Sequence, residues 1–187
     1  MFLNSIKLFS FILCLLLSAC VTIQAPPTQQ PLRIGLKLSP ASFGQTLSLQ
    51  QHLTVERAGS INTLDVALDI DPQQVNLVGL AMGQRVMSLH YDGKDLQVWR
   101  NPHLPKQVRG EDVLEDLELT LWPIAAIQKA LPPGWQISEQ GMQRTLFFDT
   151  IPIMEIQYST KQHWQGTIVL TNLRYHYRLT IQSVVAQ

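Results

Sequence analysis

Residues 64–99 read LDVALDIDPQQVNLVGLAMGQRVMSLHYDGKDLQVW, and they carry the strongest strand pattern in the chain. Apolar Leu64, Val66, Leu68 and Ile70 alternate with polar neighbours. Successive side chains of a β-strand point to opposite faces, so this alternation predicts a sheet with one apolar face. The Asp92-Gly93 pair stands between two such runs and predicts a hairpin, because glycine readily takes the positive φ of a tight turn.

Further strand patterns lie on both sides of this stretch. Residues 46–56 alternate in the same way and are expected to form a hairpin with residues 64–70, with residues 57–62 as the turn. Later runs cover residues 144–148, 153–159, 164–172 and 175–184, which gives about ten strands. The last run places Leu179 and Ile181 on one face and Arg178 on the other, with His176 facing solvent. Residues 32–38, LRIGLKL, fit either a further strand or an arm.

The spacing of the apolar residues changes in the middle of the chain, at residues 110–134. Apolar residues there recur at steps of three, four and seven, which predicts helices. Pro123 cannot donate a backbone hydrogen bond, so we expect one helix to end near Trp122 and a second to begin with Pro123. The acids of the first helix could be an acid/base group, but a solvated face is the better interpretation. They are Glu111, Asp112, Glu115, Asp116 and Glu118.

A sheet of about ten strands twists strongly enough to curl into a barrel or an open trough. Two short helices cannot cover its whole apolar face. Either side chains fill the interior, or an apolar cavity remains beneath the helices for a ligand. The residues expected to line that cavity come from the central strands and from both helices. They are Leu89, Leu96, Val98, Leu117, Leu121, Trp122, Ile124 and Ile127.

An apolar run from Leu8 to Leu17 follows Lys7 and is too short to span a bilayer. It ends in Leu-Ser-Ala-Cys, residues 17–20, which resembles the processing site of bacterial lipoproteins. That resemblance implies a signal peptide at residues 1–19 and acylation of Cys20, with palmitate-type chains; the alternative is an ordinary export signal. The second cysteine, Cys14, would leave with the signal peptide. Val21, where an aspartate would retain some lipoproteins in the inner membrane, favours the periplasmic face of the outer membrane of a Gram-negative bacterium.

Residues 20–31 are interpreted as the lipidated cysteine and a flexible tether, because two adjacent prolines and polar spacers prevent regular structure. Residues 32–187 form the predicted single domain. The formal net charge is zero, and no basic stripe is present, so nucleic acid is not an expected partner. The sequence has no G-x-S-x-G, no H-E-x-x-H and no zinc-type cysteine pair, and its histidines are dispersed. We therefore expect no catalysis, metal or cofactor, and a monomer.

Three stretches together resemble the LolA and LolB proteins, a periplasmic carrier and an outer-membrane acceptor of lipoproteins. They are residues 78–98, residues 113–135, and residues 144–158 running on to residues 173–184. LEDLELTLWP, residues 114–123, is more similar to uncharacterised LolB-like lipoproteins often encoded near aryl-polyene or polyketide-like lipid pathways. The resemblance implies a mainly β fold with a central helical pair, in which an incomplete antiparallel barrel of ten or eleven strands has a helical lid.

The LolB resemblance also implies a membrane-contact loop, here Leu80, Ala81 and Met82; alternatively, Leu80 and Met82 end a buried strand. It further implies a periplasmic LolA-like carrier as a partner. The resulting hypothesis is a lipid-anchored protein that binds an apolar or acylated molecule, such as a lipid or a lipoprotein, and passes it to the membrane. A structural lipoprotein that docks another envelope protein is the alternative, and an enzyme is a third.

Overall fold

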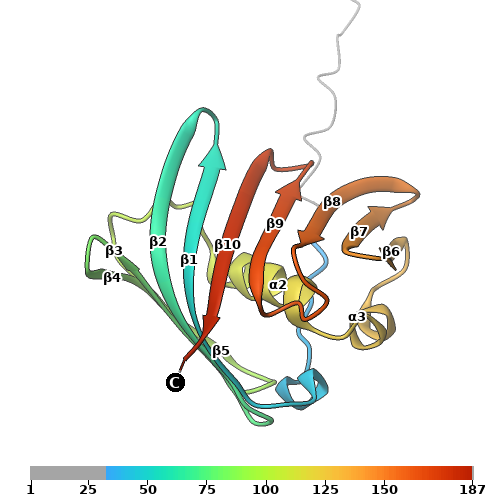
Figure 1. The fold of residues 1–187 in the computed structure, drawn as a ribbon, viewed down its shortest axis with the longest axis horizontal. Helices are drawn as coiled ribbons and strands as arrows, with labels where there is room; N and C mark the ends of the chain where they lie inside the picture. The colour runs from blue at the N-terminus through green and yellow to red at the C-terminus, as the bar shows by residue number, and fades with distance from the viewer. Residues whose placement is uncertain (1–32, 187) are drawn as a thin grey trace, which may run out of the picture. The chain divides into compact units, whose positions relative to one another are not determined.

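The computed structural model describes residues 33–186, and from Ile34 onward the chain forms one unit (Figure 1). The expected signal peptide, the acylated Cys20 and the tether at residues 20–31 lie outside the described residues. Within residues 33–186, no helix is long and apolar enough to cross a membrane.

One antiparallel sheet of ten strands dominates the described chain. The strands are β1 (Leu47–Arg57), β2 (Ser60–Ile70), β3 (Val75–Ala81), β4 (Gln84–Tyr91), β5 (Leu96–Arg100), β6 (Trp135–Gln140), β7 (Gln143–Phe148), β8 (Ile151–Tyr158), β9 (Gly166–Asn172) and β10 (Tyr177–Val185). Their order across the sheet is β5-β4-β3-β2-β1-β10-β9-β8-β7-β6. The mainly β, antiparallel architecture predicted from the alternation is confirmed.

The sheet consists of two meanders of consecutive hairpins, joined where β1 pairs with β10. This central ladder runs from Leu49 opposite Val185 to Arg57 opposite Tyr177. Strands β5 and β6 stand at the two ends of the order, so the sheet is open rather than closed. Its long central strands curve around one face, as expected from the twist of so wide a sheet (Figure 1).

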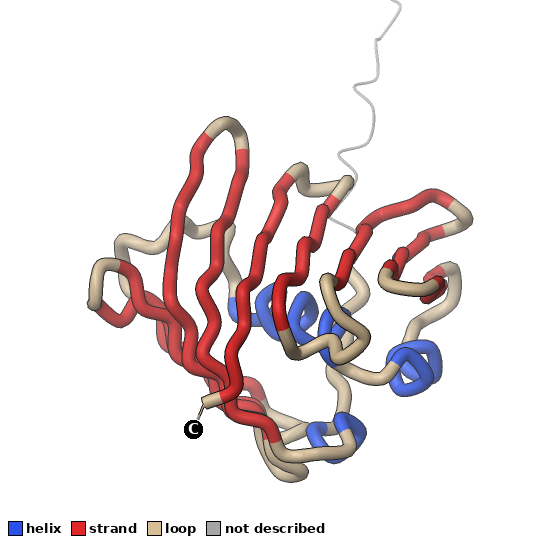
Figure 2. Tube along the Cα trace, viewed as in Figure 1, coloured by secondary structure: helices blue, strands red, loops and turns tan. Residues whose placement is uncertain are grey.

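Two helices, α2 (Gly110–Leu121) and α3 (Ile124–Ala130), lie on the concave face (Figure 2). Helix α2 crosses that face from the edge strand β5, where Gly110 meets Val98, to β8, where the Tyr158 hydroxyl donates to the carbonyl of Thr120. A Cβ on Gly110 would lie 2.3 Å from Val98, so only glycine permits this close start of the helix. The helix therefore bridges both halves of the sheet.

The core lies between α2 and the concave side of the strands. Its largest fully buried apolar side chains are Trp122, Tyr91, Leu49, Leu68, Ile70, Leu114, Leu119, Ile127, Leu146, Ile156 and Ile168. They come from the strands of both meanders and from both helices. Burial at alternate strand positions matches the predicted pattern, as in β3, where Val75 and Leu77 are buried and Asn76 is only partly so.

Several element boundaries differ from the sequence-based expectation. The β1–β2 turn is shortened to Ala58 and Gly59, whose φ angles of 49° and 79° are both positive, so both strands are longer than predicted. Helix α2 ends at Leu121 as expected, whereas α3 begins at Ile124, with Pro123 as its N-cap. Strand β6 has no counterpart among the predicted strands, because Trp135 and Ile137 are its only buried positions.

Residues 34–39 form an extended arm rather than a further strand. Leu36 and Leu38 are buried, at 4% and 5% exposure. The backbone N–H groups of the arm donate to helix α2: Gly35 to Glu115 at 2.9 Å and Leu38 to Glu118 at 2.7 Å. The arm leads into a short 3-10 helix, η2 (Pro40–Phe43).

The interpretation of the α2 acids as one solvated face is wrong. Glu118 is 0% exposed, and Glu115 and Asp116 are partly buried; only Glu111 is fully on the surface. The pattern misled because these acids bind groups that the sequence does not place next to them. Glu115 and Glu118 accept hydrogen bonds from the arm, and Asp116 accepts one from Tyr177 of β10.

Candidate functional site

The residues predicted to line a cavity beneath the helices are mostly packed in the core. Exposure is 2% for Leu89, 9% for Leu117, 4% for Leu121, and 0% for Trp122 and Ile127. Leu96 and Ile124 are half-buried, and Val98 is 36% exposed. A side chain that lined a water-sized space would keep accessible area, so the seam between helices and sheet is largely filled by side chains.

Trp122 lies at the joint between α2 and α3, as its position in the sequence indicated. Its ring packs against Phe43 of η2, with the centroids 5.0 Å apart. Its indole N–H lies 3.1 Å from the hydroxyl of Ser42 and donates to it. A buried tryptophan with a satisfied N–H serves here to fix the joint beneath η2.

The apolar side chains that keep accessible area on the concave face lie elsewhere, toward the ends of the central strands. Leu53 and Val55 in β1, Leu64 in β2 and Leu179 in β10 are all half-buried. The register places Leu53 opposite Leu64 and Val55 opposite Leu179, so these four residues adjoin on one face. We call them the apolar strip. The deeper residues of the same face, such as Leu49 and Leu68, are 1% exposed.

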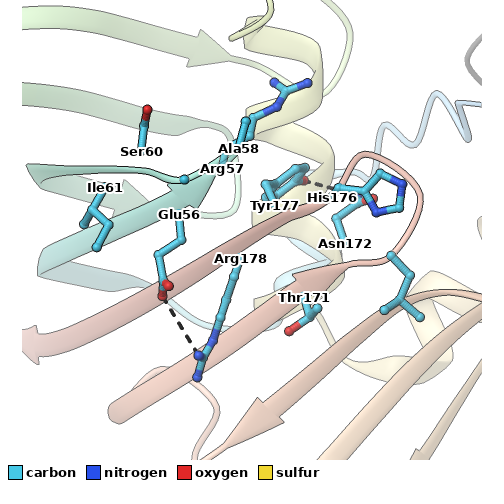
Figure 3. A pocket seen from close by; sticks show the side chains of 12 residues that line it. Glu56, Arg57, Ala58, Ser60, Ile61, Thr171, Asn172, His176, Tyr177 and Arg178 are labelled. Carbon is cyan, nitrogen blue, oxygen red and sulfur yellow. Dashed lines mark hydrogen bonds and ion pairs between the residues drawn. The ribbon is translucent and has the colours of Figure 1, made fainter.

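A pocket of about 580 Å³ opens beside the strip, between the tips of the β1–β2 and β9–β10 hairpins (Figure 3). It is lined by Glu56, Arg57, Ala58, Gly59, Ser60, Ile61, Thr171, Asn172, Leu173, His176, Tyr177 and Arg178. The strand register divides the lining between two faces. Arg57 and Tyr177 are opposite one another on the concave face, whereas Glu56 and Arg178 form a 3.9 Å ion pair on the other.

One wall of this pocket is joined to helix α2 by a chain of hydrogen bonds. The hydroxyl of Tyr177 donates to Oδ2 of Asp116 at 2.6 Å, and Nδ2 of Asn172 lies 3.3 Å from the same hydroxyl. Desolvation raises the pKa of Asp116 to about 7, although the hydrogen bond from Tyr177 opposes this shift. Burial beside Asp116 raises the pKa of Tyr177 far above its ordinary value. Tyr177 is therefore held in place as a neutral donor.

A second polar cluster surrounds Arg144 of β7, which is 1% exposed. Its guanidinium donates to Glu139 at 2.6 Å and to the carbonyl of Leu119, near the end of α2, at 2.8 Å. It also lies 3.1 Å from Nδ1 of His163, whose pKa is lowered by burial and by the charge of Arg144. A cation at a helix C-terminus is favourable. This cluster is saturated with internal partners, so it holds α2 against the sheet.

The predicted membrane-contact residues form the β3–β4 turn. Met82 is 104% exposed and has a φ of 50°, so it does not end a buried strand. Leu80 and Ala81 are half-buried at the end of β3. Their contact with a membrane stays a prediction.

Titratable groups do not gather into a metal site in the part of the chain that the structure describes. Within residues 33–186, no group of three or more histidine, cysteine, aspartate or glutamate side chains is placed to hold a metal ion. Of the histidines, His176 is exposed in the β9–β10 turn, as predicted from its strand pattern. The absence of catalysis stays an expectation.

Residues 48–185 match the family model described as a protein of unknown function, DUF3261. The chain belongs to the DUF3261 family. No curated protein sequence matched this family member. The matched residues include all ten strands except the first residue of β1, Leu47, together with both helices.

Solved structures with a similar fold include two complexes that contain MucB. One, of MucB with MucA(peri), is 15% identical at a TM-score of 0.41, and the match covers 81% of this chain and 54% of the other. The other, from Pseudomonas aeruginosa, is 16% identical at a TM-score of 0.42, with coverage of 80% and 55%. The DUF3261 chain thus spans about half the length of the chains it matches.

The sequence pattern predicts the strands of the apolar strip but not the strip itself. Leu53, Val55 and Leu64 stand out in the sequence only as apolar residues that alternate with polar neighbours. Their distinguishing property, that no helix residue covers them fully, depends on where α2 crosses the sheet. The pocket was missed because it joins two hairpin tips separated by more than one hundred residues in the chain. The only sequence signal of the pocket is the β1–β2 tip, where small residues follow Arg57.

Proposed function

We propose that this protein is a lipid-anchored protein of the outer membrane that binds an apolar or acylated molecule and passes it to the membrane without covalent chemistry. The observation that carries the proposal is the apolar strip. Four large aliphatic side chains remain partly exposed on a concave surface that otherwise forms the core. Ligand sites are typically concave and mostly apolar, with a few polar groups at one end.

The proposed ligand position differs from the one first expected. The seam beneath the helices is filled, so the ligand chain would lie beyond α2, on the strip. Attachment to the membrane through Cys20 and delivery through Met82 complete the proposal. Several acyl chains on one cysteine would hold the protein to a leaflet almost permanently.

The test is binding of 1-aminoanthracene, an uncharged fluorescent probe, to the chain from Val21 to Gln187 with a start methionine in place of Cys20. This chain contains the whole described sheet and core. We expect saturable binding that is displaced by dodecanol, and a stabilisation of about 2.7 kcal/mol at a hundredfold excess over the dissociation constant. Leu64→Asn should weaken binding, whereas Ile61→Asn should not.

Ile61 is a matched control because it lies in the same strand, is 69% exposed and faces the opposite side, across from Glu56. Equal loss in both variants, or no saturable binding in the parent, would contradict the proposal. The filled seam favours a second candidate, a structural lipoprotein that docks another envelope protein. A stable complex formed by a protein that binds neither probe would support that candidate.

A further inference from the structure

We propose that the ligand of the apolar strip is an anionic amphiphile, whose acid group is bound by Arg57 at the mouth of the hairpin-tip pocket. This inference rests on the proposed function and names the chemical class of its ligand. It follows from what stands at the end of the strip. Along β1 the concave positions read Leu53, Val55 and Arg57, so the apolar run ends in a cation.

Arg57 is available to a ligand. It is exposed at the end of β1. It forms no hydrogen bond or ion pair with another described residue, in contrast to Arg144 and Arg178. The pocket beside it has room for a head group, at about 580 Å³. A guanidinium offers a planar set of donors that matches carboxylate or phosphate oxygens.

The groups next to Arg57 are already paired with other residues. Directly opposite Arg57, Tyr177 has its hydroxyl committed to Asp116. The nearest acid on β1 is Glu56, which faces the other side of the sheet and pairs with Arg178 (Figure 3). Arg57 thus shares a face with Leu53 and Val55 and adjoins the strip, while Arg178 shares the pocket but not the face.

The strip and Arg57 together form an amphipathic surface, apolar along the strands and cationic at one end. The four side chains of the strip would contact a hydrocarbon chain, and that chain would end beside Arg57, where β1 ends and β10 begins. An anionic head group would there exchange water for the guanidinium while staying partly hydrated in the pocket. An uncharged molecule of equal length would gain the apolar contacts alone. A fatty acid and an alkyl phosphate share this chemistry.

The experiment compares dodecanoate, dodecyl phosphate and dodecanol, each below its aggregation limit, in displacing 1-aminoanthracene from the chain of residues 21–187. We expect both anions to bind at least about threefold more tightly than dodecanol, an advantage that shrinks in 0.5 M salt. Tighter binding of dodecyl phosphate than of dodecanoate would identify phosphate as the preferred head group, and the reverse a carboxylate. Either order supports the proposal.

Variants decide which side of the pocket is used. Arg57→Gln should remove the preference for the anions without changing dodecanol binding, and Arg57→Lys should restore part of it. Arg178→Gln, in the same pocket but on the other face, should leave the preference intact. Equal binding of all three ligands, or loss of the preference in Arg178→Gln alone, would overturn the inference but leave the proposed function standing. Binding of none of the three would overturn both.

Discussion

The backbone N–H of Leu38 donates to Oε1 of Glu118 over 2.7 Å, across 80 positions of sequence. This bond ties the extended arm to the middle of helix α2 at a point where the carboxyl group is 0% exposed. The other oxygen of Glu118 is buried and has no hydrogen-bond partner among residues 33–186. Such a carboxyl is more stable neutral than charged, which makes it sensitive to pH.

We expect stability to fall as the pH rises through this carboxyl's titration. Desolvation raises the pKa of Glu118 to about 8, from an ordinary value of 4.5. The folded state holds the proton of Glu118 more tightly than the unfolded state. The resulting contribution to the unfolding free energy is complete below pH 4.5 and is lost as the pH rises toward 8. Glu118→Gln keeps an acceptor for Leu38 and cannot ionise.

The measurement is urea unfolding of parent and Glu118→Gln at pH 5 and pH 9. Between pH 5 and pH 9, the unfolding free energy of the variant relative to the parent should rise by more than about 1 kcal/mol, since one pKa unit corresponds to about 1.4 kcal/mol. Asp116, whose pKa is raised to about 7, contributes in both proteins and so cancels in the comparison. A constant difference between the two proteins would show that Glu118 does not titrate in this range.

Arg144 should be among the most sensitive positions in the fold. Arg144→Met removes the partner of Glu139 and leaves the carbonyl of Leu119 without its donor, so we expect a loss of about 3 kcal/mol in unfolding free energy. Arg144→Lys should restore little of this unfolding free energy, because one ammonium cannot reach all the partners of a guanidinium. Arg178→Gln, which breaks only the exposed 3.9 Å pair, is the control and should cost less than about 1 kcal/mol. Similar losses in all three variants would contradict this assignment.

The filled seam predicts the response to enlarging Leu117. Because Leu117 is 9% exposed and faces the core, Leu117→Trp should destabilise by about 1 to 3 kcal/mol through strain. Thermal unfolding measures this loss, with Leu117→Met as a control of similar volume. A Leu117→Trp protein as stable as the parent would instead indicate open space beneath α2.

Substitutions in the β3–β4 turn can distinguish an effect on membrane contact from an effect on folding. Met82→Glu should weaken association of an unlipidated chain with liposomes while changing the unfolding free energy by no more than about 0.5 kcal/mol, since the side chain is 104% exposed. Leu80→Glu should cost more stability, because Leu80 is half-buried. Unchanged liposome binding by Met82→Glu would remove this residue from the delivery step.

Cys20 lies outside the described residues, and its acylation is predicted from sequence alone. Cys20→Ala should leave an unprocessed precursor that takes up no fatty acid in metabolic labelling. Cys14→Ala is the matched control and should be labelled and cleaved like the parent. Label in the Cys20→Ala protein would place the modification on another residue.

Sequence patterns predicted most of the fold because strands and helices leave local periodic signals. The alternation of Leu64 to Ile70 and the break at Pro123 are both confirmed within a few residues. What failed depends on contacts between distant segments. Glu118 resembles any charged helix residue until Leu38 is placed beside it, and Arg57 resembles a turn residue until the tip of β9–β10 is placed next to it.

The pairing of β1 with β10 also has a consequence for how the protein forms. Each meander grows from neighbouring hairpins, which close quickly, but the ladder from Leu49–Val185 to Arg57–Tyr177 joins segments more than one hundred residues apart. The hydrogen bonds at the centre of the sheet therefore form only after nearly all of the domain has been synthesised. Until then β1 has an open edge, whose unpaired N–H and C=O groups can pair with another chain.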